Sequence, residues 1–232
     1  MDWTVKQRAN STATARAPVK PGPESTAAGA AANMRVSNGL KEFLWLISDN
    51  GQGKILDLGA VFQSTVMFFI EKGFRLSTED LLRSWKEFLH AEEESMRNAA
   101  VGDGNARVSQ GMLAGKFLET ALQYPEDHFH GVLAWDLFDY LDAELLSRVM
   151  ERLYAVMRPG GAVLASFHSR APERFNRYKV VDSQTLELVP TPTITVHARV
   201  FQNREILDIF GKFRSSKTFV GRDQVREALL LK

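Results

Sequence analysis

Short apolar runs alternate with amphipathic segments through the middle of the chain. Four short runs are predicted to be strands, at residues 54–58, 74–78, 129–135 and 162–167. All of them except 74–78 are apolar almost throughout, which is typical of strands buried on both faces of a sheet. Between them, apolar residues recur every three or four positions, which predicts helices. These helices are expected at residues 38–47, 65–72, 81–89 and 143–156. The alternation predicts an α/β fold, a doubly wound and mostly parallel sheet.

The last third of the chain has a different pattern. Segments 178–181 and 185–189 flank the polar turn Asp182-Ser183-Gln184, which predicts a hairpin. A strand at 193–201, a helix at 203–213 and edge strands at 217–220 and 228–231 are expected to follow. The sheet should therefore close with antiparallel strands.

Polar residues interrupt the pattern between the second and third apolar runs. The run Glu92-Glu93-Glu94 is interpreted as a solvated helix face. Residues 95–111 are rich in Asn, Gly, Asp and Arg and are predicted to form a mobile loop. A weak helical segment at 117–122 follows, and no further strand is identifiable before residue 129. Residues 1–37, rich in Ala, Ser, Thr and Pro, are predicted to be a disordered tail rather than a targeting peptide, and 38–232 a single domain.

Composition excludes several classes of function. The formal net charge of +1 gives no signature of nucleic-acid binding. No run approaches the roughly 18 apolar residues that span a bilayer, so no membrane association is expected. The chain has no cysteine, which excludes disulfides and favours a reducing, cytoplasmic location. His128 and His130 have no further ligands close in sequence, and no metal site is predicted.

The first candidate ligand-binding residues follow the first apolar run, which ends in Asp57-Leu58-Gly59. A carboxylate and a glycine at the carboxyl end of a parallel strand are typical of a nucleotide-like cofactor site, where the backbone must approach the ligand closely. A helix followed by Arg158-Pro159-Gly160-Gly161 and an apolar strand lies further along. The acid Glu79 stands 22 residues beyond Asp57, at the end of the second strand.

In this order, these motifs resemble those of the class I S-adenosylmethionine-dependent methyltransferase superfamily, of which the chain looks like a divergent member. The resemblance covers about residues 38–168 and implies a Rossmann-like fold that binds S-adenosylmethionine. It implies that the loop after Asp57, with Gly59, passes under the methionine part of the cofactor. It also implies that Glu79 receives the ribose hydroxyls, that Asp136 lies beside the methyl group, and that Trp135 is a further cofactor-binding residue.

Each of these residues also has a purely structural interpretation. Asp57 can be a turn-forming acid without a ligand, and Glu79 or Asp80 can cap the helix that begins at Leu81. Asp136 either orients a substrate nucleophile or caps a short helix through Phe138. Aromatic residues such as Trp135 are more often part of the core than of a substrate mouth.

For catalysis, Asp136 and His168 are the candidate residues. His168 follows the fourth apolar run, and imidazole titrates near neutral pH, as a general base requires. No catalytic triad is evident, which agrees with a reaction that depends chiefly on positioning donor and acceptor.

Two hypotheses of function follow. The first is methyl transfer from S-adenosylmethionine to a small-molecule or protein acceptor. Val61 and Gln63 stand where the family's loop usually carries glycines. They motivate the second, a catalytically inactive methyltransferase-like module that binds a partner or regulates. A nicotinamide-dependent enzyme is disfavoured, because no Gly-x-Gly-x-x-Gly follows the first strand.

Overall fold

The computed structural model describes residues 33–48, 53–99, 109–191, 198–221 and 223–232. The first half contains β1 Met34–Val36, α2 Asn38–Ser48, β2 Lys54–Asp57, α3 Gln63–Glu71, β3 Arg75–Thr78, α4 Leu81–Ala99 and α5 Gln110–Leu118. The centre contains β4 Phe129–Trp135, the 3-10 turn η1 Leu137–Tyr140, α6 Ala143–Val156 and β5 Met157–His168. The last part contains β6 Phe175–Val180, β7 Thr185–Thr191, α7 Asn203–Ile209, β8 Ser215–Val220 and β9 Val225–Leu231.

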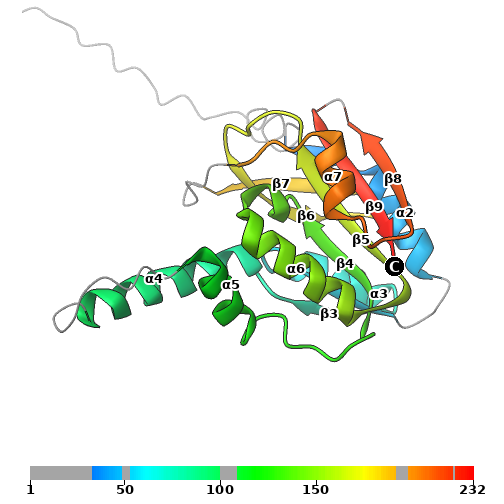
Figure 1. The fold of residues 1–232 in the computed structure, drawn as a ribbon. Helices are drawn as coiled ribbons and strands as arrows, with labels where there is room; N and C mark the ends of the chain where they lie inside the picture. Colours follow the sequence, from blue (N-terminus) through cyan, green and yellow to red (C-terminus); the bar gives the residue numbers. More distant parts are fainter. Residues whose placement is uncertain (1–32, 49–52, 100–108, 192–197, 222) are drawn as a thin grey trace, which may run out of the picture. The chain divides into compact units, whose positions relative to one another are not determined.

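The main sheet has six strands in the order β3-β2-β4-β5-β9-β8 (Figure 1). Its first four strands are parallel; β9 then pairs antiparallel with β5, and β8 pairs antiparallel with β9. The predicted fold, a mostly parallel α/β sheet with antiparallel C-terminal strands, is confirmed. The apolar runs of β4 and β5 are buried because helices cover both faces of the sheet.

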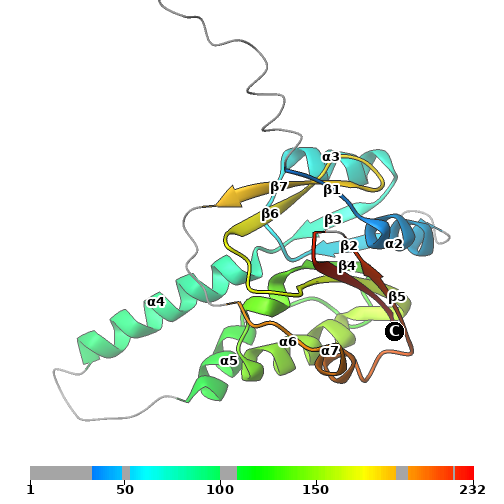
Figure 2. The same ribbon diagram turned by 90° about the horizontal axis from the view of Figure 1, so that it is seen from above.

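Helices and a second sheet form layers on either side of the main sheet. Figure 2 shows α5, α6 and α7 on one side and α2 and α3 on the other. The second sheet, in the order β1-β7-β6, lies on the side of α2 and α3. The predicted hairpin is the antiparallel pair β6 and β7, with Val180 opposite Leu186. It belongs to this second sheet and not to the main one.

Local capping explains where several helices begin and end. The Asp142 carboxylate accepts a hydrogen bond from the Leu145 backbone N–H at 2.9 Å and so caps α6. The Ser37 hydroxyl accepts from the Leu40 N–H at 2.9 Å and caps α2. Gly73 follows α3 with φ of +84°, a conformation that favours glycine after a helix.

The predicted loop at 95–111 is wrong at both ends. α4 continues to Ala99 and α5 already begins at Gln110, while residues 100–108 lie outside the described ranges. The Glu92 carboxylate, expected on a solvated face, contacts Lys116 Nζ of α5 at 2.6 Å. This polar contact joins the two helices. The sequence did not indicate it, because the acidic run of α4 is typical of a solvated helix face.

Three other expectations are corrected. The predicted tail contains β1, which pairs with β7, so the fold begins before residue 38; residues 1–32 lie outside the described ranges. β9 is not an edge strand, because it lies between β5 and β8. Residues 198–201 form no strand, and most of the predicted strand before them is not described.

Candidate functional site

The predicted site residues meet at one edge of the main sheet. Because β3, β2, β4 and β5 are parallel neighbours, their carboxyl ends lie side by side. They carry, in that order, Glu79, Asp57, Asp136 and His168. The Glu79 N–H donates to the Asp57 carbonyl at 2.8 Å, and the Leu58 N–H to the Leu133 carbonyl at 2.9 Å. These bonds fix the loops at the edge where open α/β sheets bind ligands.

Asp57 is buried, and its carboxylate is bound by neighbouring donors. Its Oδ1 accepts from the Gly59 N–H at 2.9 Å and from the Trp135 indole Nε1–H at 2.7 Å. Burial raises the pKa of Asp57 to about 6, and these two bonds act against that rise. The carboxylate therefore holds the loop and the indole together.

Trp135 fills the space over Gly59. A Cβ built on Gly59 would lie 2.7 Å from the indole Cδ1, which shows how closely the ring packs on this glycine. One face of the indole stacks on the Tyr178 ring of β6, with centroids 5.3 Å apart and an angle of 5° between the ring planes. The surface of Gly59 that was expected to face a ligand faces a side chain of the same protein.

The cavity at this point is small. Its volume is about 30 Å³, and it is bordered by Gly59, Asp80, Asp136 and the β6 residues from Phe175 to Tyr178. Ligand pockets are at least about tenfold larger, at roughly 300–1,000 Å³. The residues here include the carboxylates a nucleoside cofactor would need, but the space does not fit a molecule of that size.

Glu79 is also engaged within the protein. Its Oε1 accepts from the Leu122 N–H at 2.9 Å, and Leu122 has the unusual φ of +55°. The Tyr124 hydroxyl lies next to the same carboxylate; burial and then Glu79 raise the pKa of Tyr124 to about 12. The neighbouring Asp80 accepts from the Arg83 N–H at 3.2 Å, so Asp80 is the acid that caps α4.

A second group of polar side chains lies between the ends of β4 and β5. His168 Nδ1 is 2.9 Å from Asp139 Oδ2, and the same oxygen accepts from the His168 backbone N–H at 2.8 Å. His168 Nε2 lies 3.8 Å from Asp136 Oδ2. The two candidates chosen from the sequence, Asp136 and His168, are therefore neighbours. Asp136 Oδ2, Asp139 Oδ1 and the Tyr140 hydroxyl are buried and have no hydrogen-bond partner among the described residues.

Burial and mutual contacts shift the pKa values in this group. Burial raises the pKa of Asp136 to about 7, opposed by His168 and supported by Asp139. Burial also raises the pKa of Asp139, opposed by His168. Burial acts to lower the pKa of His168, but the two carboxyls outweigh it, and the pKa of His168 is raised. Groups that exchange protons near neutral pH are suited to acid–base chemistry.

Two contributors to these sites were not found in the sequence. Asp139 lies in η1 and is fully buried, and its run Leu137-Phe138-Asp139-Tyr140 looked like ordinary core. Tyr178 comes from β6, and only the hairpin pattern marked that segment. Asp136 stands at the N-cap position of η1 but makes no side-chain capping bond there, so the capping interpretation is not observed.

The remaining predicted residues lie away from these contacts. Val61 is 59% exposed and Gln63 begins α3, so neither side chain fills the cavity. His130 Nδ1 accepts from the Lys54 N–H at 3.0 Å, and burial together with positive neighbours lowers the pKa of His130. Across the described ranges, no cluster of three or more His, Cys, Asp or Glu residues could hold a metal ion.

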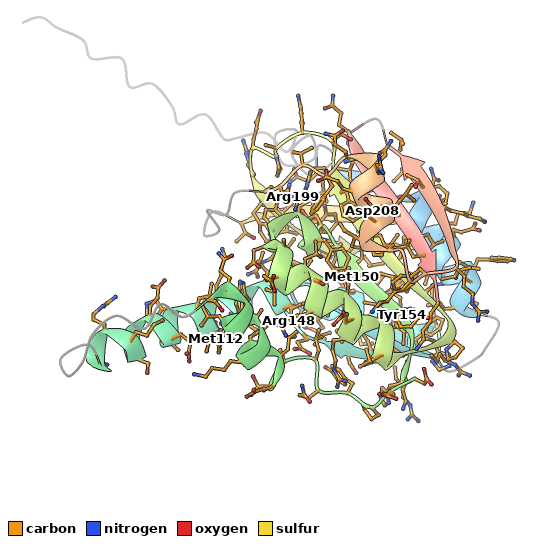
Figure 3. The ribbon with its side chains drawn as sticks, in the orientation of Figure 1. Met112, Arg148, Met150, Tyr154, Arg199 and Asp208 are labelled. Atoms are coloured by element: carbon orange, nitrogen blue, oxygen red, sulfur yellow. The ribbon has the colours of Figure 1, made fainter. Side chains whose placement is uncertain are left out.

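A larger groove, of about 460 Å³, lies between α6 and α7 and contains none of the strand-end carboxylates. Figure 3 shows Met150 of α6 with Arg199 and Asp208 around it. Phe201, Ile209 and Phe213 add apolar surface, and the Arg199–Glu205 ion pair of 2.5 Å lies at the groove.

Comparisons with known proteins found similarity to solved structures only, at low sequence identity. No family model and no curated protein matches the sequence. Solved structures that are similar include the 1,6-didemethyltoxoflavin-N1-methyltransferase of Burkholderia thailandensis, with bound 1,6-didemethyltoxoflavin and S-adenosylhomocysteine. It is 14% identical, with 94% of this chain and 93% of that chain covered and a TM-score of 0.44. An S-adenosylmethionine-dependent methyltransferase of Mesorhizobium loti is 14% identical over 83% of this chain and 98% of that one, with a TM-score of 0.44. A methyltransferase of the same class from Aquifex aeolicus is 12% identical over 84% of this chain and 90% of that one, with a TM-score of 0.44.

Among the described helices, none has the length and apolarity to cross a membrane.

Proposed function

We propose that this chain is an S-adenosylmethionine-dependent methyltransferase that acts on a small-molecule or protein acceptor. The observation that carries the proposal is the row of carboxyl groups Glu79, Asp57 and Asp136 at the ends of three adjacent parallel strands. It supports cofactor binding at this edge, because a carboxylate there can accept both hydroxyls of a ribose. When bound, the cofactor supplies a methyl group on a positive sulfur, a reactive leaving group.

In this proposal Glu79 holds the ribose, and the Asp57–Gly59 loop lies against the methionine part. Asp136 and His168 face the acceptor, where a raised pKa suits a group that takes up a proton. The cofactor does not fit the 30 Å³ cavity, so binding requires the indole of Trp135 to leave Gly59. Glu79 must likewise exchange its bond to Leu122 for one to the ligand.

The closed cavity also favours the second candidate function, a methyltransferase-like module without activity. In such a module Trp135 and Tyr178 would be permanent core residues, and the strand-end carboxylates would only hold loops. The two candidates differ in one measurable property, which is the binding of S-adenosylmethionine.

Isothermal titration calorimetry with S-adenosylmethionine and S-adenosylhomocysteine tests the proposal. The titration is made on the wild-type chain and on Trp135→Ala, which lacks the indole that fills the space. We expect saturable binding, and absence of binding to both proteins at millimolar ligand overturns the proposal in favour of the inactive module.

The role of Glu79 is tested separately. Glu79→Gln keeps an oxygen that can accept from the Leu122 N–H but loses the charge, and we expect it to bind S-adenosylmethionine at least tenfold more weakly, as one lost charged hydrogen bond implies. Glu71→Gln, an exposed acid at the end of α3, is the matched control. Equal affinity in Glu79→Gln and wild type would exclude the ribose assignment.

A further inference from the structure

We infer that Trp135 is an internal plug that occupies the cofactor's place over Gly59, and that it must swing out before a nucleoside ligand can bind. The inference rests on the proposed cofactor site and adds a conformational step that controls it. Three kinds of observation support it: the contacts of the indole, the backbone that aims it, and the strand that backs it.

The indole makes the contacts that a ligand would make. It packs on Gly59 so closely that a Cβ there would lie 2.7 Å away, and its N–H donates to Asp57 at 2.7 Å. A ligand over this loop would use the same glycine surface and the same carboxylate. The side chain is 3% exposed, so no space remains for both.

The backbone at Trp135 is specially shaped. Its φ is +49°, which is uncommon for a residue other than glycine, and the register of β4 with β5 shifts between Leu133 and Trp135. Such irregularities at strand ends redirect a side chain and are frequent next to functional sites. Here the irregularity directs the indole toward β2, onto the loop after Asp57.

β6 holds the plug in place through a stacked aromatic ring. Tyr178 stacks on the indole with centroids 5.3 Å apart, and the Val180 N–H donates to Thr65 Oγ1 of α3 at 2.9 Å. Residues 175–178 of the same strand border the small cavity. The plug is therefore an indole clamped between the loop after β2 and a strand of the second sheet.

The size of the expected change in affinity depends on how many molecules have the indole swung out. If only a fraction of molecules have the indole swung out, the apparent affinity for the ligand falls by that fraction. Removing the indole abolishes the competition, so a plug closed in about 90% of molecules or more predicts an increase in affinity of about tenfold or more.

The test is calorimetric titration of S-adenosylmethionine into wild-type protein, Trp135→Ala, Trp135→Phe and the control Trp45→Ala. Trp45 is a tryptophan of α2 that is 62% exposed. We expect tighter binding by Trp135→Ala, a smaller gain for Trp135→Phe, which loses only the N–H and part of the ring, and no change for Trp45→Ala. Circular dichroism checks that each variant is folded. If Trp135→Ala does not fold, the comparison of Trp135→Phe with wild type still tests the inference.

The outcomes separate this inference from the proposed function. If Trp135→Ala binds as tightly as wild type, there is no plug, although the function stands. If it binds more weakly, the indole contacts the ligand, as the sequence suggested, and the plug is again excluded. If no folded variant binds, the proposed function fails and the plug fails with it.

A second measurement follows the plug directly. In wild-type protein the Trp135 indole should be shielded from acrylamide quenching, and saturation with S-adenosylmethionine should make it accessible. Trp45→Phe simplifies the signal by removing one exposed tryptophan. An indole that stays shielded at saturation overturns the inference.

Discussion

Asp57 and Asp136 end two neighbouring parallel strands, and they differ in what surrounds their carboxyl groups. Both are buried, with exposures of 2% and 3%. Oδ1 of Asp57 accepts from two donors, Gly59 and Trp135. Oδ2 of Asp136 has no partner among the described residues and lies 3.8 Å from His168 Nε2.

This difference separates two tasks. Bonds to fixed donors favour a carboxylate that stays ionised and holds structure, and the pKa of Asp57 rises only to about 6. Asp136 lies among other titratable groups, with its pKa raised to about 7 by burial. One end of the site therefore holds a loop and an indole, whereas the carboxyl at the other end lies beside His168 and has a raised pKa.

The largest expected effect on stability comes from removing the carboxylate of Asp57. Asp57→Ala leaves the buried Trp135 N–H and the half-buried Gly59 N–H without a partner, and the free energy of unfolding should fall by about 3 kcal/mol. Asp57→Asn keeps an acceptor oxygen and should lose about 1 kcal/mol. Urea unfolding at pH 7 measures both.

The matched control is Asp80→Ala. Its carboxylate accepts from an exposed Arg83 N–H at 3.2 Å, and loss of such a cap destabilises by about 1 kcal/mol or less. If Asp57→Ala destabilises no more than Asp80→Ala, then Asp57 does not hold the loop.

Much of this fold could be predicted from the sequence because its signals are local. The run from Phe129 to Trp135 is apolar except for His130 and forms β4 with the predicted bounds. Asp142 caps α6 as its spacing to Leu145 suggests. Burial of a strand on both faces and capping by a side chain depend on neighbouring residues in the chain.

The closed site could not be predicted, because its contacts join distant segments. Trp135 lies at the predicted edge, but its direction depends on a register shift and on Tyr178, which lies in another sheet. The extension of α4 was missed for a similar reason, since Lys116 lies 24 residues after Glu92, its partner. Periodicity indicates which face of an element is apolar and gives no information about which distant side chain covers it.

The second prediction concerns pH and sharpens the contrast at Asp136. Because its folded pKa of about 7 lies above the unfolded value near 3.9, the folded state binds more protons, and stability falls as pH rises. Between pH 5 and pH 7 this group alone should remove about 2 kcal/mol from the free energy of unfolding. Asp57 and His168, whose pKa values are also raised, act in the same direction.

Chemical unfolding at several pH values measures this slope. Asp136→Asn should flatten it, whereas Asp182→Asn should leave it unchanged, because turn hydrogen bonds lower the pKa of Asp182 out of this window. An unchanged slope in Asp136→Asn would mean that Asp136 is already ionised at pH 5 in the folded protein.

The smallest expected effect concerns Tyr178, because this residue contacts both Trp135 and Asp136. Its ring stacks on Trp135, and its hydroxyl lies beside Asp136 and lowers the pKa of that carboxyl. Tyr178→Phe keeps the stack and removes the hydroxyl, so stability at pH 7 should fall by about 1 kcal/mol or less, while the pKa of Asp136 rises further. Tyr154→Phe, on α6, is the control.

Carbon-detected NMR titration of the Asp136 carboxyl measures its pKa. If that pKa does not rise in Tyr178→Phe, the plug and the proton-binding group are independent, and opening of the site would leave the protonation of Asp136 unchanged.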